Sequence, residues 1–224
     1  MTTATTANIL SSVDATPAVY GERGALLLDE VSWELYEQLL KETAHQNLRI
    51  TYDEGRLFLM SPLPKHEKVK TLTGRMIELA SLERGIPIAS LGSTTWKRQE
   101  LKKGLEADEC YYMQHEKQVR ALMDLDLSRD PPPDLAIEVY ISYNPLNRPS
   151  VYSALRVPEI WRFRRDAYEF LLRSADGTYH SIPRSEALPF LTPADINRFV
   201  DKIGTTDETS LMLEFREWVR ALQL

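Results

Sequence analysis

The spacing of apolar residues predicts two helices in the first half of the chain. From residue 26 to residue 42 apolar side chains recur every three or four positions, with Asp29 placed to cap the helix. A clearer helix is predicted from residue 66 to residue 84, where Gly85 provides the stop. Its apolar stripe consists of Val69, Leu72, Met76, Leu79 and Ala80. Both patterns indicate amphipathic helices with one apolar face.

Short runs of strand-like composition fill most of the remaining chain. Residues 49–52 and 56–60 are predicted to form a hairpin, because Asp53-Glu54-Gly55 between them is a tight-turn signal. Further strands are predicted at 88–91, 94–97, 107–113, 134–141, 160–164, 168–173 and 179–182, and further helices at 150–156, 193–203 and 209–222. This order predicts an α/β fold whose mixed, strongly antiparallel sheet is flanked by helices.

Composition narrows the class of protein without deciding it. At 224 residues and 43% apolar content the chain can bury one sizeable core, so we expect a single domain over residues 25–224. Residues 1–24 are expected to be a disordered leader and not a signal peptide. No apolar run approaches the roughly 18 residues that span a bilayer, and the single cysteine, Cys110, fits a reducing compartment. We therefore expect a cytoplasmic protein with no membrane partner.

The net charge of −6 counts against binding nucleic acid by bulk electrostatics. Two local basic clusters stand out, at residues 97–103 and at residues 162–165. Taken alone, each is more simply explained as a solvated face or a strand edge. If the protein binds DNA, the affinity must come from a local patch, from a homodimer or from a metal ion.

Acidic residues in two predicted strands are candidates for a metal-binding site. Alternation places Asp134 and Glu138 on one face of the strand 134–141, and a carboxylate among apolar residues is costly unless it is paired or binds a metal. Asp134, at the mouth of the strand, is more simply a solvated end or a cap. In the strand 107–113 only one of Asp108 and Glu109 can face the Glu138 side. Asp108 and Glu138 together would suit Mg²⁺, which prefers oxygen ligands, and the alternative is an ion pair with a nearby Arg or Lys.

Five motifs occur in a fixed order between residues 30 and 200. They are YDEGRLFLMSP (52–62, followed by His66-Glu67), GLEADECYY (104–112), PDLAIEV (133–139), LNRPSVY (146–152) and VPEIWR (157–162). In this order they resemble the Uma-two family of restriction-endonuclease-like proteins, whose members are assigned to the PD-(D/E)XK nuclease superfamily. The resemblance implies a restriction-endonuclease-like fold, and hydrolysis of DNA phosphodiester bonds with Mg²⁺ or Mn²⁺.

The resemblance also implies roles for single residues. Asp108 matches the superfamily's first acid and Glu138 its second, so both are implied as catalytic residues and metal ligands. Tyr140 stands where the superfamily has its usual lysine, and Arg148, on the following helix, stands where this family has one. Arg148 is therefore implied to stabilise charge on the phosphate, but it cannot act as a base because arginine stays protonated. His66 matches a family histidine. Its functional role would be to contact phosphate or to shuttle a proton. Its structural role would be to close off the N-terminus of the helix or to pack under the sheet.

Two functions from different classes follow. The first is a Mg²⁺-dependent DNA endonuclease, and the second is a catalytically inactive nuclease-fold module that binds nucleic acid or a protein partner. The retained acid pair favours the first, whereas Arg148 and the negative net charge favour the second. Two carboxylates that share a site without metal should raise at least one pKa. Removing either one should leave stability unchanged or raise it, because the repulsion between them is relieved.

Overall fold

The computed structural model describes residues 24–141 and 144–223, so nearly all of the expected leader (1–24) lies outside the described residues. The helices are α2 (Trp33–Glu42), α3 (Pro64–Arg84), α4 (Glu116–Val119), α5 (Arg148–Ala154), α6 (Pro193–Val200) and α7 (Glu208–Ala221), with a 3₁₀ turn, η2 (Gln99–Leu101). The strands are β1 (Ala25–Leu28), β2 (Arg49–Asp53), β3 (Arg56–Met60), β4 (Ala89–Ser90), β5 (Thr95–Arg98), β6 (Lys103–Glu106), β7 (Glu109–Tyr112), β8 (Leu135–Tyr140), β9 (Glu159–Arg164), β10 (Ala167–Arg173) and β11 (Tyr179–Ile182).

The strands form two sheets. The five-stranded sheet has the order β1-β3-β2-β6-β5 and is antiparallel throughout. The six-stranded sheet has the order β11-β10-β9-β8-β7-β4, and it is mixed because β8 and β9 run parallel while its other pairs are antiparallel. The predicted mixed sheet flanked by helices is confirmed, and the separate five-stranded sheet was not predicted.

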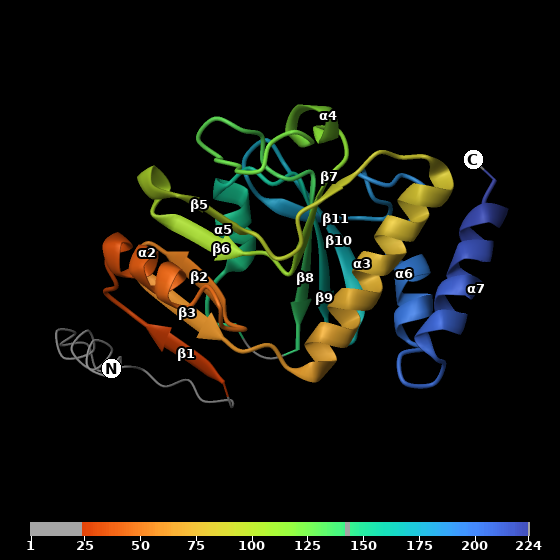
Figure 1. The fold of residues 1–224 in the computed structure, drawn as a ribbon, viewed down its shortest axis with the longest axis horizontal. Coiled ribbons are helices and arrows are strands. Elements are labelled where there is room, and N and C mark those ends of the chain that lie inside the picture. The colour runs from red at the N-terminus through yellow and green to blue at the C-terminus, as the bar shows by residue number, and fades with distance from the viewer. Residues whose placement is uncertain (1–23, 142–143, 224) are drawn as a thin grey trace.

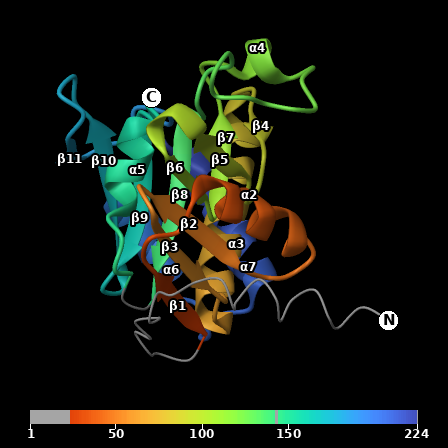
Figure 2. The ribbon, with the colours of Figure 1, turned by 90° about the vertical axis from the view of Figure 1, so that its left-hand side faces the viewer.

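Helices cover both faces of the six-stranded sheet. Helices α3, α6 and α7 pack together on one face, where their apolar side chains form the largest core cluster (Figure 1). Helix α5 covers the other face and also contacts β6, so it lies where the two sheets meet. The five-stranded sheet and α2 lie on the side of the molecule opposite α7 (Figures 1 and 2). No helix in the described part of the chain is long and apolar enough to cross a membrane.

The predicted helix 66–84 is confirmed as α3, which begins two residues earlier. Pro64 occupies its first turn, where the missing N–H of proline costs nothing. Gly85 ends it in the left-handed conformation with φ of 62°, which glycine adopts without strain. The helix buries its predicted stripe against the six-stranded sheet and thereby fixes His66 at the junction of the two sheets.

The predicted helix 26–42 is wrong in its first part. Residues Ala25–Leu28 form β1, which pairs antiparallel with β3, and the helix starts only at Trp33. Ser32 is the N-cap and accepts a hydrogen bond from the Leu35 N–H, whereas Asp29 forms an exposed ion pair with Arg56. A short apolar run cannot be assigned to strand or helix by periodicity alone, and here the open edge of β3 decides the outcome.

Candidate active site

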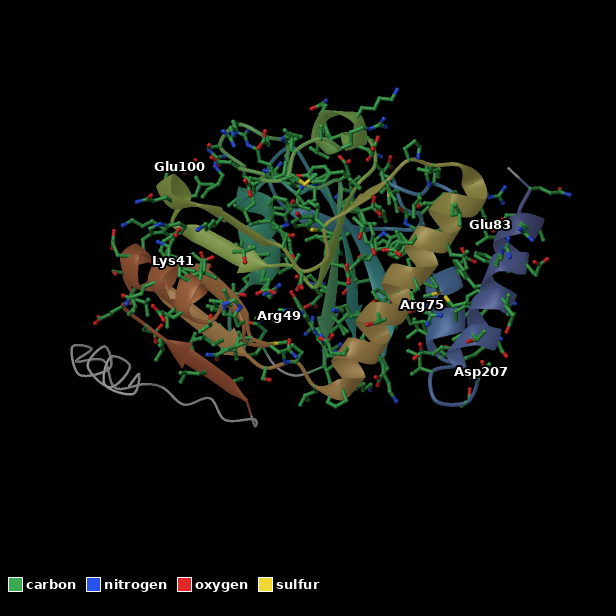
Figure 3. All side chains as sticks on the ribbon, viewed as in Figure 1. Lys41, Arg49, Arg75, Glu83, Glu100 and Asp207 are labelled. Atoms are coloured by element: carbon green, nitrogen blue, oxygen red, sulfur yellow. The ribbon has the colours of Figure 1, made fainter. Side chains whose placement is uncertain are left out.

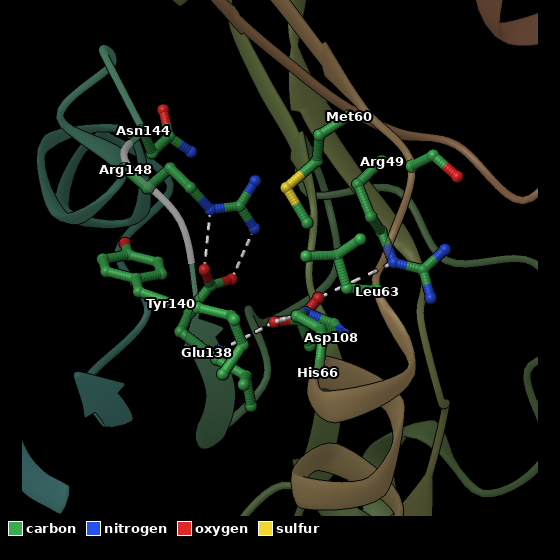
Figure 4. A pocket seen from close by; sticks show the side chains of 12 residues that line it. Arg49, Met60, Leu63, His66, Asp108, Glu138, Tyr140, Asn144 and Arg148 are labelled. Carbon is green, nitrogen blue, oxygen red and sulfur yellow. Dashed lines mark hydrogen bonds and ion pairs between the residues drawn. The ribbon is translucent and has the colours of Figure 1, made fainter. Parts of the chain in front are cut away.

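A small pocket opens where β3, β8 and α5 meet the first turn of α3 (Figure 4). Its volume is about 30 Å³, enough for a water molecule or a metal ion. Its wall includes Asp108, Glu138, Arg148 and His66, the four residues that the sequence singled out, together with Arg49. Segments far apart in the chain are thus brought to one place by the packing of the two sheets.

Asp108 lies in a break between two strands, not inside one strand as expected. Strand β6 ends at Glu106 in the five-stranded sheet, and β7 starts at Glu109 in the six-stranded sheet. The chain crosses from one sheet to the other at this break. Because Glu109 is paired with Ile137, the register one step further places Asp108 opposite Glu138. The open choice between Asp108 and Glu109 is thus decided in favour of Asp108.

The buried carboxylate of Asp108 has three neighbours. Its Oδ2 accepts a hydrogen bond of 2.8 Å from the Val139 N–H and lies 3.0 Å from Nε2 of His66. Its Oδ1 lies 3.6 Å from Nε of Arg49, too far for a hydrogen bond. Arg49 makes its shorter ion pair, at 2.8 Å, with Glu106. Asp108 therefore keeps one oxygen that is only loosely engaged.

The carboxylate of Glu138, in the middle of β8, is held on both oxygens. The guanidinium of Arg148 donates to Oε2 at 2.6 Å and to Oε1 at 2.5 Å, a bidentate pair (Figure 4). The Tyr152 hydroxyl also donates to Oε1. Arg148 itself donates further to the hydroxyl of Thr51 and to the backbone carbonyl of Glu106. Glu138 and Arg148 thus form a buried ion pair that ties α5 to both sheets.

The start of α5 explains the position of Arg148. The helix begins at Arg148, with Asn147 as the N-cap accepting from the Ser150 N–H and Pro149 in the first turn. Tyr152 follows four residues later, so it lies on the same helix face as Arg148. Arg148 lines the same pocket as the two acids.

His66 is buried in the first turn of α3 and lies between two carboxylates. Its Nδ1 is 3.1 Å from Oε1 of Glu67, which is partly exposed. Its Nε2 is 3.0 Å from Asp108, but the contact is an ion pair and not an aligned hydrogen bond, so Nε2 has no hydrogen-bond partner among the described residues. Nε of Arg49 is likewise buried without such a partner, and Figure 3 places Arg49 between β2 and α3. Two buried nitrogens at the pocket are therefore available to an oxygen ligand.

The pKa values of Asp108, Glu138 and His66 are shifted by their different surroundings. Burial acts to raise the pKa of Asp108, but His66 and then Arg148 outweigh it and hold this pKa below its usual value. Burial raises the pKa of Glu138, Arg148 offsets this only in part, and the nearby charge of Asp108 raises it further. Burial acts to lower the pKa of His66, but Asp108 and Glu67 raise it above its usual value. The expected raised carboxyl pKa is confirmed at Glu138, with burial as its largest cause.

Other candidates from the sequence lie outside this pocket. Asp134 accepts hydrogen bonds from the N–H groups of Met113 and His115 and contacts the His115 ring, so it caps the end of a strand as expected. Cys110 is buried in β7, and burial raises the pKa of its thiol to about 12, which leaves it unreactive. Glu109 lies 3.8 Å from Lys70 on the α3 side of the sheet.

Two residues of the site were missed from the sequence, Arg49 and Tyr152. Arg49 opens a strand whose next three residues are all buried, so an arginine there must have an acidic partner. Tyr152 stands four positions after Arg148 in a predicted helix, and this spacing was a usable signal.

The donor types at the pocket fit one hard divalent cation. Mg²⁺ is commonly bound by one or two carboxylates and keeps several waters, and Asp108 and Glu138 would provide the carboxylates. The loosely engaged Oδ1 of Asp108 is suited to a metal as it stands. Glu138 fits only if Arg148 gives up one of its oxygens. Within residues 24–141 and 144–223, no group of three or more His, Cys, Asp or Glu side chains has metal-binding geometry.

Comparison with known proteins gives one family. The model of the Uma2 family, described as "Putative restriction endonuclease", matches residues 33–198, about three quarters of the chain. The match includes all four predicted site residues and the whole pocket wall. No curated protein matches the chain. The α/β architecture and its mixed sheet agree with the restriction-endonuclease-like fold of the family.

Proposed function

We propose that this chain, which belongs to the Uma2 family, is a Mg²⁺-dependent endonuclease that hydrolyses phosphodiester bonds in DNA. The observation that carries this proposal is the composition of the pocket. Two buried carboxylates, Asp108 and Glu138, face it together with two buried nitrogens of Arg49 and His66 that lack hydrogen-bond partners among the described residues. Acidic groups suit the cation, and N–H groups suit the oxygens of a phosphate.

Asp108 and Glu138 would hold the ion, with Mn²⁺ as a substitute. A bound Mg²⁺ would supply Lewis-acid activation of the scissile phosphate and of the attacking water. The volume of about 30 Å³ accommodates the ion but not a nucleotide, so the DNA must lie across the mouth of the pocket. Only the reacting phosphate then needs to approach the two acids.

Arg148 and Arg49 would stabilise negative charge at the pocket, and His66 would transfer a proton. Arg148 is fully charged and buried beside Glu138, so it stabilises negative charge that develops on the phosphate. Arg49 offers its Nε to the same group of oxygens. His66 lies between Asp108 and the partly exposed Glu67, so it can pass a proton between the pocket and solvent. None of these roles requires Arg148 to act as a base.

Plasmid nicking by the purified protein tests this function. We expect wild type to nick supercoiled DNA with Mg²⁺ or Mn²⁺ and to lose this activity in chelator. Asp108→Ala should abolish nicking, whereas Glu109→Ala should retain it because Glu109 lies beside Lys70 on the α3 side. Loss of activity in Glu109→Ala but not in Asp108→Ala would contradict the assignment.

One observation favours the inactive module as a second candidate. The bidentate hold of Arg148 on Glu138 neutralises the second acid within the protein itself, without any ion. If wild type nicks no DNA form with either metal, this reading replaces the enzymatic one. A gain of nicking in Arg148→Lys would show instead that the scaffold works once the second acid is released.

A further inference from the structure

The two basic clusters of the sequence have different surroundings in the folded protein. In the cluster at residues 97–103, Lys97 pairs with Glu37 at 2.7 Å, and Lys103 pairs with Asp53 and Glu54. Arg98 is likewise neutralised by an acid, two residues further along the chain. Most of the charge of this cluster is therefore compensated within the protein, and it offers little to a polyanion.

The cluster at residues 162–165 lies at the end of β9 and in the turn to β10. Strand β9 runs parallel to β8 with Glu138 paired to Arg162 and Tyr140 paired to Arg164. Residues paired in this way lie on the same face of a sheet. Arg164 is therefore on the face that carries Glu138, two residues closer to the end of the strand. Its neighbour Tyr140 lines the pocket.

The turn also contacts the first turn of α3. Lys65 lies 2.7 Å from Asp166, which brings the β9–β10 turn beside the residue that precedes His66 (Figure 1). This ion pair neutralises the charge of Asp166, the only acidic residue of the turn. Arg164 and Arg165 are exposed and form no ion pair with any residue in the described parts of the chain. Their charges are thus free beside the pocket.

The backbone of the turn has an unusual conformation at its two central residues. Arg165 and Asp166 have φ of 53° and 62°, so both central positions are left-handed. Asn and Gly are preferred at such positions, because other side chains are strained there. An arginine at this position projects from the tip of the hairpin at a local cost in stability.

We propose that Arg164 and Arg165 bind the phosphate backbone of duplex DNA and hold it across the mouth of the pocket. Lys68, exposed on α3 three residues after Lys65, extends the same basic surface. The assignment rests on the proposed nuclease function for the identity of the polyanion. With a net charge of −6, the protein cannot bind DNA by its overall charge, and a local patch of this kind is one source of the affinity it needs. The contacts are to phosphates, so they give affinity and register without sequence preference.

The test measures DNA binding separately from cleavage. Fluorescence anisotropy follows a labelled DNA duplex in EDTA, over salt from about 50 to 200 mM. The variant is Arg164→Gln with Arg165→Gln, and the matched control is Lys41→Gln with Lys102→Gln. Both control lysines are exposed and form no ion pair within the described residues, and Lys102, like Arg165, has a positive φ, of 48°. Lys41 lies on α2, far from α3 (Figure 3).

We expect the arginine variant to bind about tenfold more weakly and its salt slope to fall by about two, the loss of two phosphate contacts. The control should bind like wild type, and melting temperatures should show that both variants are folded. Equal loss in both variants, no loss in the arginine variant, or no DNA binding by wild type would overturn the proposal. Tighter binding of an RNA duplex of the same sequence would overturn the choice of DNA. If binding depends on the two arginines while wild type nicks no plasmid, the docking surface stands and the nuclease function falls.

Discussion

The two carboxylates of the pocket lie opposite each other, but the protein holds them in different ways. Glu138 accepts three hydrogen bonds, two from the guanidinium of Arg148 and one from the hydroxyl of Tyr152. Asp108 accepts one aligned hydrogen bond, from the Val139 N–H, and its Oδ1 meets Arg49 only at 3.6 Å. The Glu138 side is a closed ion pair, and the Asp108 side is open to a ligand.

This difference shows where the protein itself takes the place of a cation. At Glu138 an arginine supplies the positive charge that an ion would otherwise supply, whereas at Asp108 the compensation is shared among looser partners. If the proposed function is right, binding of Mg²⁺ would require an exchange at Glu138 alone. The affinity for metal would then be set mainly by the strength of the pair between Glu138 and Arg148.

The largest expected effect is on stability. Glu138→Gln should cost about 3–5 kcal/mol in the free energy of unfolding, because it leaves the buried charge of Arg148 without its partner. Asp108→Asn should cost only about 1 kcal/mol, because the amide still accepts from Val139 and Arg49 retains Glu106. His66 also loses its partner, but unlike Arg148 it can give up its charge by releasing a proton. Urea denaturation in EDTA measures both values. Equal losses of unfolding free energy in the two variants would contradict the difference between the Glu138 side and the Asp108 side.

A double variant sharpens this comparison. Glu138→Leu with Arg148→Met removes both charges, so it should recover most of the stability that Glu138→Gln loses. This prediction differs from the expectation based on carboxylate repulsion, in which removing either acid leaves stability unchanged or raises it, and the urea measurement decides between the two. That expectation considered the two acids alone and left out how much Arg148 depends on Glu138.

A smaller effect is expected on metal affinity. Arg148→Lys should strengthen Mg²⁺ binding about tenfold, or by about 1.4 kcal/mol, because lysine is a point charge that cannot occupy both oxygens of Glu138. The rise of the melting temperature with MgCl₂ measures this affinity. Asp108→Asn, made in either background, is the control and should abolish the rise. An unchanged or weaker affinity in Arg148→Lys would show that Arg148 does not compete with the ion.

The smallest effect concerns pH and the Asp108 side. His66 has a raised pKa in the folded protein, so the stability it contributes is present below its ordinary pKa of about 6.5 and is lost as pH rises through the raised value. The difference in unfolding free energy between wild type and His66→Gln should therefore be larger at pH 6 than at pH 9. Urea denaturation in EDTA at both values measures it. A difference that grows with pH would contradict the ion pair with Asp108.

Much of the fold could be predicted from periodicity and turn chemistry. The hairpin of β2 and β3 is confirmed, because Glu54 and Gly55 both adopt the positive φ that a tight turn needs. The division into two sheets was missed. No glycine or proline marks the break at Asp108, so only the packing of the second sheet shows where one strand ends.

The residues of the candidate site were predicted from the sequence, but the contacts between them were not. Acids in two predicted strands identified Glu138 and, with Glu109 as the alternative, Asp108, and the family resemblance supplied Arg148 and His66. The bidentate pair between Glu138 and Arg148 could not be predicted, because it depends on how closely α5 approaches β8. The contact of the β9–β10 turn with α3 likewise arises from tertiary packing.

The most direct test of one metal site between Asp108 and Glu138 is a crystal structure with Mn²⁺. We predict an anomalous peak about 2.1 Å from an oxygen of each carboxylate. We also predict that Arg148 has released at least one oxygen of Glu138 in that structure. Crystals saturated with Mn²⁺ that show no peak between the two carboxylates, with the bidentate pair of Arg148 and Glu138 intact, would contradict the account.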